Sequence, residues 1–203
     1  MYSDMTTHFD FPELRLHLGL PDDFFRKLAD EDDWSFVIKL HALFEGVCSH
    51  LLTYHFREQK LEKIFSRLEL SNKSTGKIAI LSELGLLQDS HKKLLYKLSE
   101  IRNSLVHDIR NSEFDLIAMV GEMDKSQIKQ FAITFSPYET LIRSAPFDGF
   151  IGFNEKQQEL ATIEHVINRA KKSPKHHIFY GAYDVLISLI DMYSYSDYLN
   201  DSK

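Results

Sequence analysis

The chain has 203 residues, of which 43% are hydrophobic and 27% charged, with 8 Gly and 5 Pro. This composition is typical of a folded globular protein and excludes a disordered, collagenous or low-complexity chain. A single cysteine, Cys48, excludes an intramolecular disulfide and a cysteine-based zinc site. Residues 1–10 lack the basic and apolar regions of a signal sequence, and no run approaches the roughly 18 apolar residues of a membrane span. We therefore expect a cytoplasmic protein that does not contact a membrane.

The charge is distributed unevenly along the chain, whose formal net charge is -6. Residues 1–33 carry 9 acidic and 3 basic side chains, residues 57–110 carry 11 basic and 7 acidic ones, and residues 111–203 carry 9 basic and 13 acidic ones. The middle stretch is therefore the candidate for binding a polyanion. A solvated helix surface explains the same excess, so composition alone leaves both interpretations open.

The hydrophobic pattern predicts helices along most of the chain. Pro21-Asp22-Asp23 begins a short helix, and apolar residues recur at helical spacing from Asp33 to about Phe56. Further helices are expected near 61–68, 74–84, 89–106, 155–170 and 175–198, with Gly85 closing one of them and an ordered aromatic loop at 137–154. Two more apolar segments, 114–120 and 128–135, are compatible with additional helices. No hairpin turn between alternating strands is found. The sequence therefore predicts an all-α fold, a bundle of about six or seven helices.

Several familiar catalytic and cofactor motifs are missing. The sequence contains no Walker loop and no GxGxxG, HExxH or GxSxG motif. His41, His50 and His55 are nine and five residues apart, which is not the i, i+4 spacing of helical metal ligands. We therefore predict neither a metal site nor a cofactor.

One polar segment interrupts the apolar stripe of the helix near 89–106. It reads Glu-Ile-Arg-Asn-Ser-Leu-Val-His-Asp over residues 100–108. At about 100° per residue, Asn103 and His107 share one face of the helix, whereas Arg102 and His107 are about 140° apart. One helix therefore does not form a compact site. Two copies crossing at a two-fold axis would form a cleft with two arginines to bind a phosphate and two histidines to move protons, which suffices for metal-free cleavage of RNA through its own 2′-hydroxyl.

The same segment resembles the HEPN superfamily, whose hallmark is an R-x(4-6)-H motif. Arg102, four residues and His107 match that motif, with Asn at the polar position after the arginine. The surrounding sequence, GKIAILSELGLLQDS followed by LLYKLSEIRNSLVHD, is similar to HEPN domains of bacterial toxin and defence proteins and to mannitol operon repressor-like proteins. The resemblance implies an up-and-down helical bundle of HEPN type, dimerisation through the motif helices and, in active members, metal-independent endoribonuclease activity at the dimer cleft.

The resemblance also implies roles for individual residues. Arg102 would bind the scissile phosphate, His107 would act as acid or base, and Asn103 would orient the phosphate or the imidazole. Family members often place an acidic or polar residue on the first long helix. Glu45 fits that description, and we expect it either to pair with Arg102 or to reach solvent at the edge of the apolar stripe. Asp108 either tunes the imidazole or is only solvated.

Two groups of basic residues have weaker claims to function. Lys92, Lys93 and Lys97 lie on the predicted motif helix and either flank a groove for RNA or form a solvated face. A denser basic run crosses Pro174 between the two last predicted helices, where a charged turn is the simpler interpretation. That run consists of Lys171, Lys172, Lys175, His176 and His177.

The resemblance divides the chain into three segments. Residues 1–32 form an acidic N-terminal segment with a short helix, and residues 33–135 form the HEPN-like helical bundle. Residues 136–203 form a loop followed by two C-terminal helices that we expect to pack on the bundle. These last residues lie outside the resemblance.

Two functional hypotheses follow from the sequence. The first is a cytoplasmic, homodimeric HEPN-type endoribonuclease, a toxin or phage-defence effector that leaves a 2′,3′-cyclic phosphate on RNA and has an antitoxin or regulatory protein as its partner. The second is a non-catalytic interaction or regulatory protein of the mannitol operon repressor-like type, in which Arg102 and His107 are structural. A DNA-binding repressor acting alone is disfavoured, because no basic recognition helix is visible.

Overall fold

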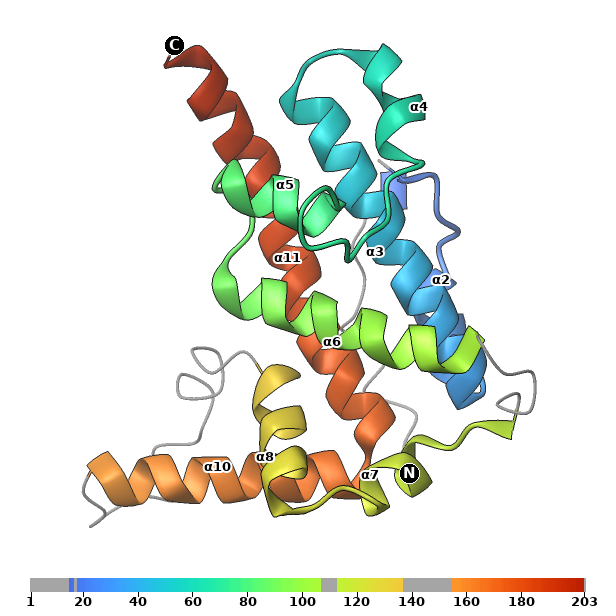
Figure 1. The fold of residues 1–203 in the computed structure, drawn as a ribbon, viewed down its shortest axis with the longest axis vertical. Helices are drawn as coiled ribbons and strands as arrows, with labels where there is room; N and C mark the ends of the chain where they lie inside the picture. Colours follow the sequence, from blue (N-terminus) through green and yellow to red (C-terminus); the bar gives the residue numbers. More distant parts are fainter. Residues whose placement is uncertain (1–14, 17, 107–112, 137–154, 203) are drawn as a thin grey trace. The chain divides into compact units, whose positions relative to one another are not determined.

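The computed structural model describes residues 15–202 except 17, 107–112 and 137–154, and of residues 155–162 it describes the backbone only. Within these ranges the chain forms helices and turns and no strand, which confirms the predicted all-α fold (Figure 1). The predicted loop at 137–154 lies outside the described residues. The helices are α2 Phe24–Asp30, α3 Asp33–His55, η2 Gln59–Leu61, α4 Glu62–Phe65, α5 Lys77–Glu83, α6 Asp89–Val106, α7 Leu116–Gly121, α8 Lys125–Thr134, α10 Glu155–Lys172 and α11 Pro174–Asp201.

The chain divides into two compact units. Unit 1 consists of residues 1–114 and 185–203, and unit 2 consists of residues 115–184. These boundaries differ from those expected at residues 33 and 135, because the second half of α11 belongs with the N-terminal helices. The two predicted C-terminal helices are present as α10 and α11.

Helix α3 is the core of unit 1 and packs against α2, α4, α5 and α6. Its buried residues, which include Phe36, Phe44, Cys48 and Leu51, lie around most of its circumference. Burial raises the pKa of the Cys48 thiol to about 12. Contrary to the sequence-based expectation, α3 has the length and hydropathy of a membrane span. Within the structure 61% of that stretch is buried, as in the core helix of a globular domain. Its length and composition alone therefore do not identify it as a membrane span.

Two glycines are required where α5 begins and ends. A Cβ atom on Gly76 would lie 2.5 Å from the carbonyl oxygen of Asn72, so no larger residue fits before the helix. Gly85 has a φ of 71°, and Leu86 N–H donates to the carbonyl oxygen of Leu81 beside it. This is the left-handed glycine that ends a helix, as the sequence predicts.

Helix α6 positions the motif. Its buried face packs on α3 and α5. That face consists of His91, Leu94, Leu95, Leu98, Ser99, Ile101 and Leu105. The helix ends at Val106, so Arg102 and Asn103 lie in its last turn.

A row of polar contacts joins the end of α3 to the second half of α11. The Nδ1 atom of His50 lies 2.7 Å from the hydroxyl of Tyr193, and the hydroxyl of Tyr54 donates to Asp197 over 2.7 Å. Next along both helices, Arg57 donates to Asp201 over 2.7 Å. Because the numbers rise together at spacings of three to four residues, the two helices run parallel here.

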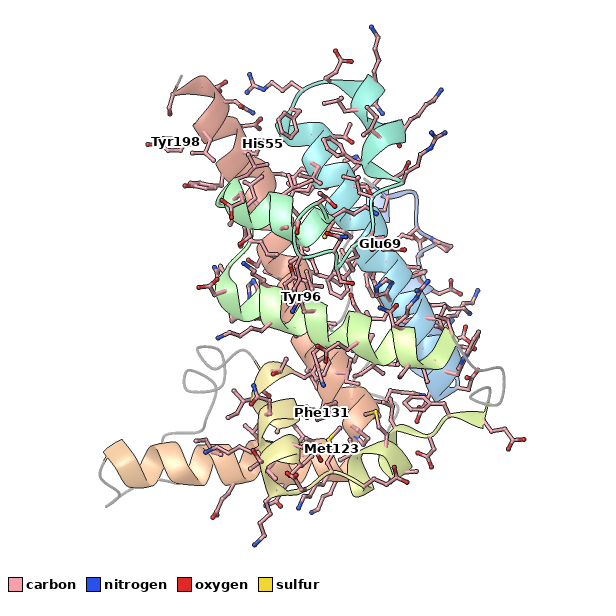
Figure 2. The ribbon with its side chains drawn as sticks, in the orientation of Figure 1. His55, Glu69, Tyr96, Met123, Phe131 and Tyr198 are labelled. Atoms are coloured by element: carbon pink, nitrogen blue, oxygen red, sulfur yellow. The ribbon has the colours of Figure 1, made fainter. Side chains whose placement is uncertain are left out.

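Unit 2 is built from α7, α8, α10 and the start of α11. Helix α8 packs on α10, and Phe131, labelled in Figure 2, is buried with Phe135 at a ring-centroid distance of 4.9 Å. Asp124 and Gln127 form a reciprocal capping box at the start of α8. The buried aromatic rings give unit 2 its own hydrophobic core, and the capping box stabilises the start of α8.

Candidate functional site

Arg102 lies half-buried in the last turn of α6. Its Nη1 atom donates to the side-chain oxygen of Asn103 over 3.0 Å. Among the described residues no carboxylate forms an ion pair with this guanidinium. The resemblance implied that Asn103 orients a phosphate or an imidazole. In the structure its side chain contacts Arg102 instead.

Glu45 does not pair with Arg102, which corrects one of the two expectations for this residue. Its carboxylate is 37% exposed and lies 3.9 Å from Nδ1 of His41. Its charge also acts on Lys77, which is 2% exposed at the start of α5. Burial lowers the pKa of this lysine, while the nearby charge of Glu45 opposes the shift. The hydrophobic pattern did not reveal this buried lysine, which provides the opposite charge near Glu45.

Ser99, His41 and Glu45 resemble a nucleophile, base and acid by residue type. The Nε2 atom of His41 lies 3.2 Å from the hydroxyl of Ser99, which itself donates to the carbonyl oxygen of Leu95 over 2.9 Å. The hydroxyl proton is thus directed to the backbone, so Ser99 accepts from the histidine and is not activated by it. Ser99 is also 1% exposed. The group is therefore a structural link between α3 and α6.

His41 is held in its neutral form. Burial, followed by the positive charges of Arg102 and Lys77, lowers its pKa to about 4. A neutral histidine that donates from Nε2 has a lone pair on Nδ1, which faces the Glu45 carboxylate at 3.9 Å. His41 therefore adds no positive charge next to Arg102 at neutral pH.

Polar groups at the end of α6 lie at the surface, and the motif continues into residues that the structure does not describe. Asn103 and Ser104 are exposed, and Val106 is 41% exposed. His107 and Asp108, the predicted acid or base and its neighbour, lie outside the described residues. The structure thus places the arginine and the asparagine of the motif but not the histidine.

The lysines of α6 do not share a face with Arg102. Lys93 is nine residues before Arg102, which places it on the opposite side of the helix and about 13 Å along it. Lys97 pairs with Glu100 at 2.9 Å, and Lys92 donates to Ser82 over 3.1 Å. Within one protomer these lysines therefore do not flank the arginine.

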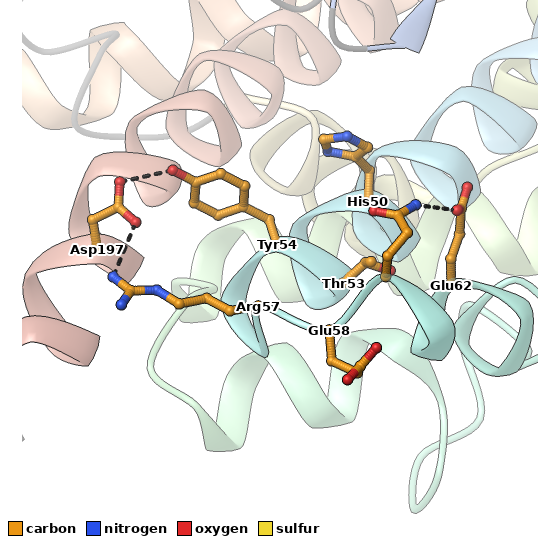
Figure 3. Close-up of a pocket in the computed structure, with 8 residues that line it drawn as sticks. His50, Thr53, Tyr54, Arg57, Glu58, Glu62 and Asp197 are labelled. Carbon is orange, nitrogen blue, oxygen red and sulfur yellow. Dashed lines mark hydrogen bonds and ion pairs between the residues drawn. The ribbon is translucent and has the colours of Figure 1, made fainter.

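An open pocket of about 460 Å³ lies in unit 1 beside the end of α3 (Figure 3). In it Tyr54 and Arg57 both reach Asp197, and Gln59 donates to Glu62. The remaining lining residues are His50, Thr53 and Glu58. The hydrogen bond to Asp197 raises the pKa of Tyr54. These groups bind one another and hold α11 against α3, so the pocket presents no activated nucleophile.

Sequence reasoning missed both the buried lysine and this polar seam. A signal for the seam exists, because His50, Tyr54 and Arg57 occur at i, i+4 and i+7, and complementary groups on α11 occur at i, i+4 and i+8. For Lys77 no comparable signal exists in the hydrophobic pattern. Among the described residues, no group of three or more His, Cys, Asp or Glu side chains is placed to hold a metal ion.

Comparison with known proteins adds no relative. No family model matches the chain, and neither a curated protein nor a solved structure matches it.

Proposed function

We propose that this protein is a HEPN-type, metal-independent endoribonuclease that acts in the cytoplasm as a homodimer. The observation that supports this most directly is the state of Arg102, whose guanidinium has a neutral amide and no carboxylate as its partner in the described part of the chain. An arginine with a purely structural role would be expected to bind a group on another element, whereas the partner of Arg102 is the next residue of the same helix. An arginine oriented by an amide at an exposed helix end is instead suited to bind a phosphate.

The reaction needs groups from two protomers. On the ideal helix that the sequence predicts, Arg102 and His107 would be about 140° apart, so in this proposal they converge where two motif helices meet. In that cleft one His107 takes the proton of the 2′-hydroxyl, whose oxygen attacks the phosphorus. The bond from phosphorus to the 5′-oxygen breaks, and the other His107 donates a proton to that oxygen. The products are a 2′,3′-cyclic phosphate and a 5′-hydroxyl, and Arg102 stabilises the charge on the phosphate.

The first test compares purified wild-type protein with His107→Ala and Arg102→Ala on labelled total RNA in the presence of EDTA. We expect cleavage by the wild type alone, with cyclic phosphate ends identified by mass spectrometry. His165→Ala and Arg67→Ala are matched controls, because both residues are exposed and lie outside the motif. Light scattering and thermal melting establish that all five proteins have the same oligomeric state and are folded.

A second measurement tests the shared cleft. An excess of His107→Ala is mixed with wild-type protein and left to exchange subunits. If one cleft needs both histidines, RNA cleavage falls below the value expected from dilution, because mixed dimers lack one of them. An excess of His165→Ala should cause no such loss.

The alternative function is tested by the same proteins. A well-folded dimer that leaves RNA intact, with the motif variants indistinguishable from wild type, would overturn the nuclease. That result would favour a non-catalytic regulatory or interaction protein.

A further inference from the structure

The corner between α10 and α11 is not explained by the proposed function. Helix α10 ends at Lys172 and α11 begins at Pro174, because proline fits the first turn of a helix and disfavours helical conformation in the residue before it (Figure 1). Basic side chains gather at this junction, which we name the α10–α11 corner. It consists of Arg169, Lys171, Lys172, Lys175 and His176.

The positive charge of this corner has no acidic counterpart nearby in the sequence. No Asp or Glu occurs between Glu164 and Asp184, the longest stretch of the chain without a carboxylate side chain. Lys171 and Lys172 are exposed and form no ion pair within the described part of the molecule. Since the whole chain has a net charge of -6, this local excess does not reflect overall composition.

Arg169 adds a half-buried charge to the corner. Its Nε atom donates to Nδ1 of His177 over 3.4 Å, and its Nη2 atom donates to the hydroxyl of Ser136 over 3.2 Å. The guanidinium also lies 5.6 Å from the ring centroid of Tyr180. All three partners are neutral, because Nε2 of His177 donates to the carbonyl oxygen of Ala132 and Nδ1 is left as an acceptor. No carboxylate of the described residues therefore neutralises Arg169.

Helix electrostatics explains only half of this arrangement. Lys171 and Lys172 lie in the last turn of α10, where positive charge is favoured by the helix dipole. Lys175 lies in the first turn of α11, where a positive charge is unfavourable. The corner thus includes a lysine that its own helix dipole does not favour, which suits an external anion better than a purely structural turn.

We propose that the α10–α11 corner is a docking surface for the phosphate backbone of single-stranded RNA. The choice of RNA among polyanions rests on the proposed function. Lysines that neutralise successive phosphates bind without regard to sequence and position a strand. The corner thus increases the affinity of the protein for its substrate and takes no part in bond cleavage.

The test is a titration of the full chain against a fluorescein-labelled single-stranded RNA with methylated 2′-hydroxyls, which the proposed reaction cannot cleave, followed by fluorescence anisotropy. The variant is Lys171→Gln with Lys172→Gln, and the matched control is Lys125→Gln with Lys129→Gln, two exposed lysines of α8 in the same unit. We expect the corner variant to raise the Kd about tenfold and to reduce the salt dependence by about 0.7 log units per lost phosphate contact. The control should bind as the wild type does, and all three should melt alike.

Equal Kd values for wild type and corner variant would overturn the proposal. An equal increase for corner and control variants would overturn it as well, since net charge alone would then be responsible. If the corner variant bound RNA normally but lost binding to phosphatidylserine vesicles, an anionic membrane and not RNA would be the ligand.

The outcomes also separate this proposal from the nuclease. RNA that is bound through the corner but not cleaved leaves the docking surface standing and removes the catalytic proposal. If the wild type cleaves RNA and the corner variant binds it with the same Kd as the wild type, the catalytic proposal stands and the docking surface is removed.

Discussion

In each unit burial, together with the charge of an arginine, lowers the pKa of a histidine. The two pairs, Arg102 with His41 and Arg169 with His177, differ in how the arginine is held. In unit 2 Arg169 donates to His177 and Ser136 and lies over the ring of Tyr180. In unit 1 the charge of Arg102 acts on His41, but its hydrogen bond goes to Asn103 at the surface. The guanidinium of Arg169 thus contacts three side chains of its unit, whereas in the described part of the chain Arg102 hydrogen-bonds to its neighbour Asn103.

The largest expected effect concerns Arg102. Arg102→Ala should lower RNA cleavage about 10²- to 10³-fold, as loss of a group that stabilises transition-state charge does. Its free energy of unfolding should change by less than about 0.5 kcal/mol, because the guanidinium holds no buried partner. Initial rates in EDTA and urea denaturation measure the two quantities. A large loss of stability would show that Arg102 is structural.

The next effect is a loss of stability in acid. The pKa of both His41 and His177 is lowered to about 4, mainly by burial, whereas an unfolded histidine has a pKa of about 6.5. Only the unfolded state takes up these protons between those values, so stability is full above pH 6.5 and falls as the pH decreases toward 4. Each group contributes about 3 kcal/mol to this loss.

Unfolding free energies across that pH range test the assignment. His177→Gln should remove the contribution of unit 2, and His41→Gln that of unit 1. The exposed His176→Gln is the matched control and should leave the pH dependence unchanged. If none of the three variants alters the pH profile, the loss of stability in acid does not come from His41 and His177.

A smaller effect is expected at Arg169. Arg169→Ala removes hydrogen bonds from a charged donor to His177 and Ser136, and it should destabilise unit 2 by about 2 kcal/mol. RNA cleavage per folded molecule should change far less than in Arg102→Ala. Thermal melting with activity measured on the same samples provides the contrast. If Arg169→Ala is as stable as the wild type, Arg169 does not stabilise its unit and does not differ from Arg102 in that respect.

The smallest effect comes from giving Arg102 a carboxylate. Asn103→Asp places a negative charge 3.0 Å from the guanidinium in the present geometry, which should stabilise the fold by about 0.5 kcal/mol at most because the pair is exposed. The same charge repels a phosphate, so RNA cleavage should fall. Asn103→Ser is the neutral control. Cleavage that is unchanged in the aspartate variant would argue against phosphate binding by Arg102.

The helices were the most predictable part of the molecule. The ranges expected from apolar spacing correspond to α3, α6, α10 and α11 within a few residues, since a helical period is a local property. The stretch expected at 61–68 is shorter, with η2 followed by the four residues of α4. A helix of this length is marginal on its own, so its extent depends on tertiary contacts that the local sequence pattern does not contain.

The candidate site was predictable only in part. The motif residues Arg102 and Asn103 could be placed at a helix end from sequence, and their mutual hydrogen bond could not. The ion pair between Glu45 and Arg102 was a reasonable expectation from the apolar phase of α3. The carboxylate of Glu45 instead lies near His41, and the opposite charge that acts near it is that of Lys77 from α5. Contacts between separate elements are not encoded in the period of either one.

By itself the sequence determined that the chain is helical, where its main helices run and which residues carry the R-x4-H motif, because these depend on neighbours a few positions apart. Only the tertiary structure decided that the end of α11 returns to α3, that Lys77 is buried near Glu45, and that Arg102 and Arg169 have different partners. Long-range packing joins residues more than a hundred positions apart, such as Tyr54 and Asp197. The energy of such contacts depends on burial and geometry that no local pattern contains.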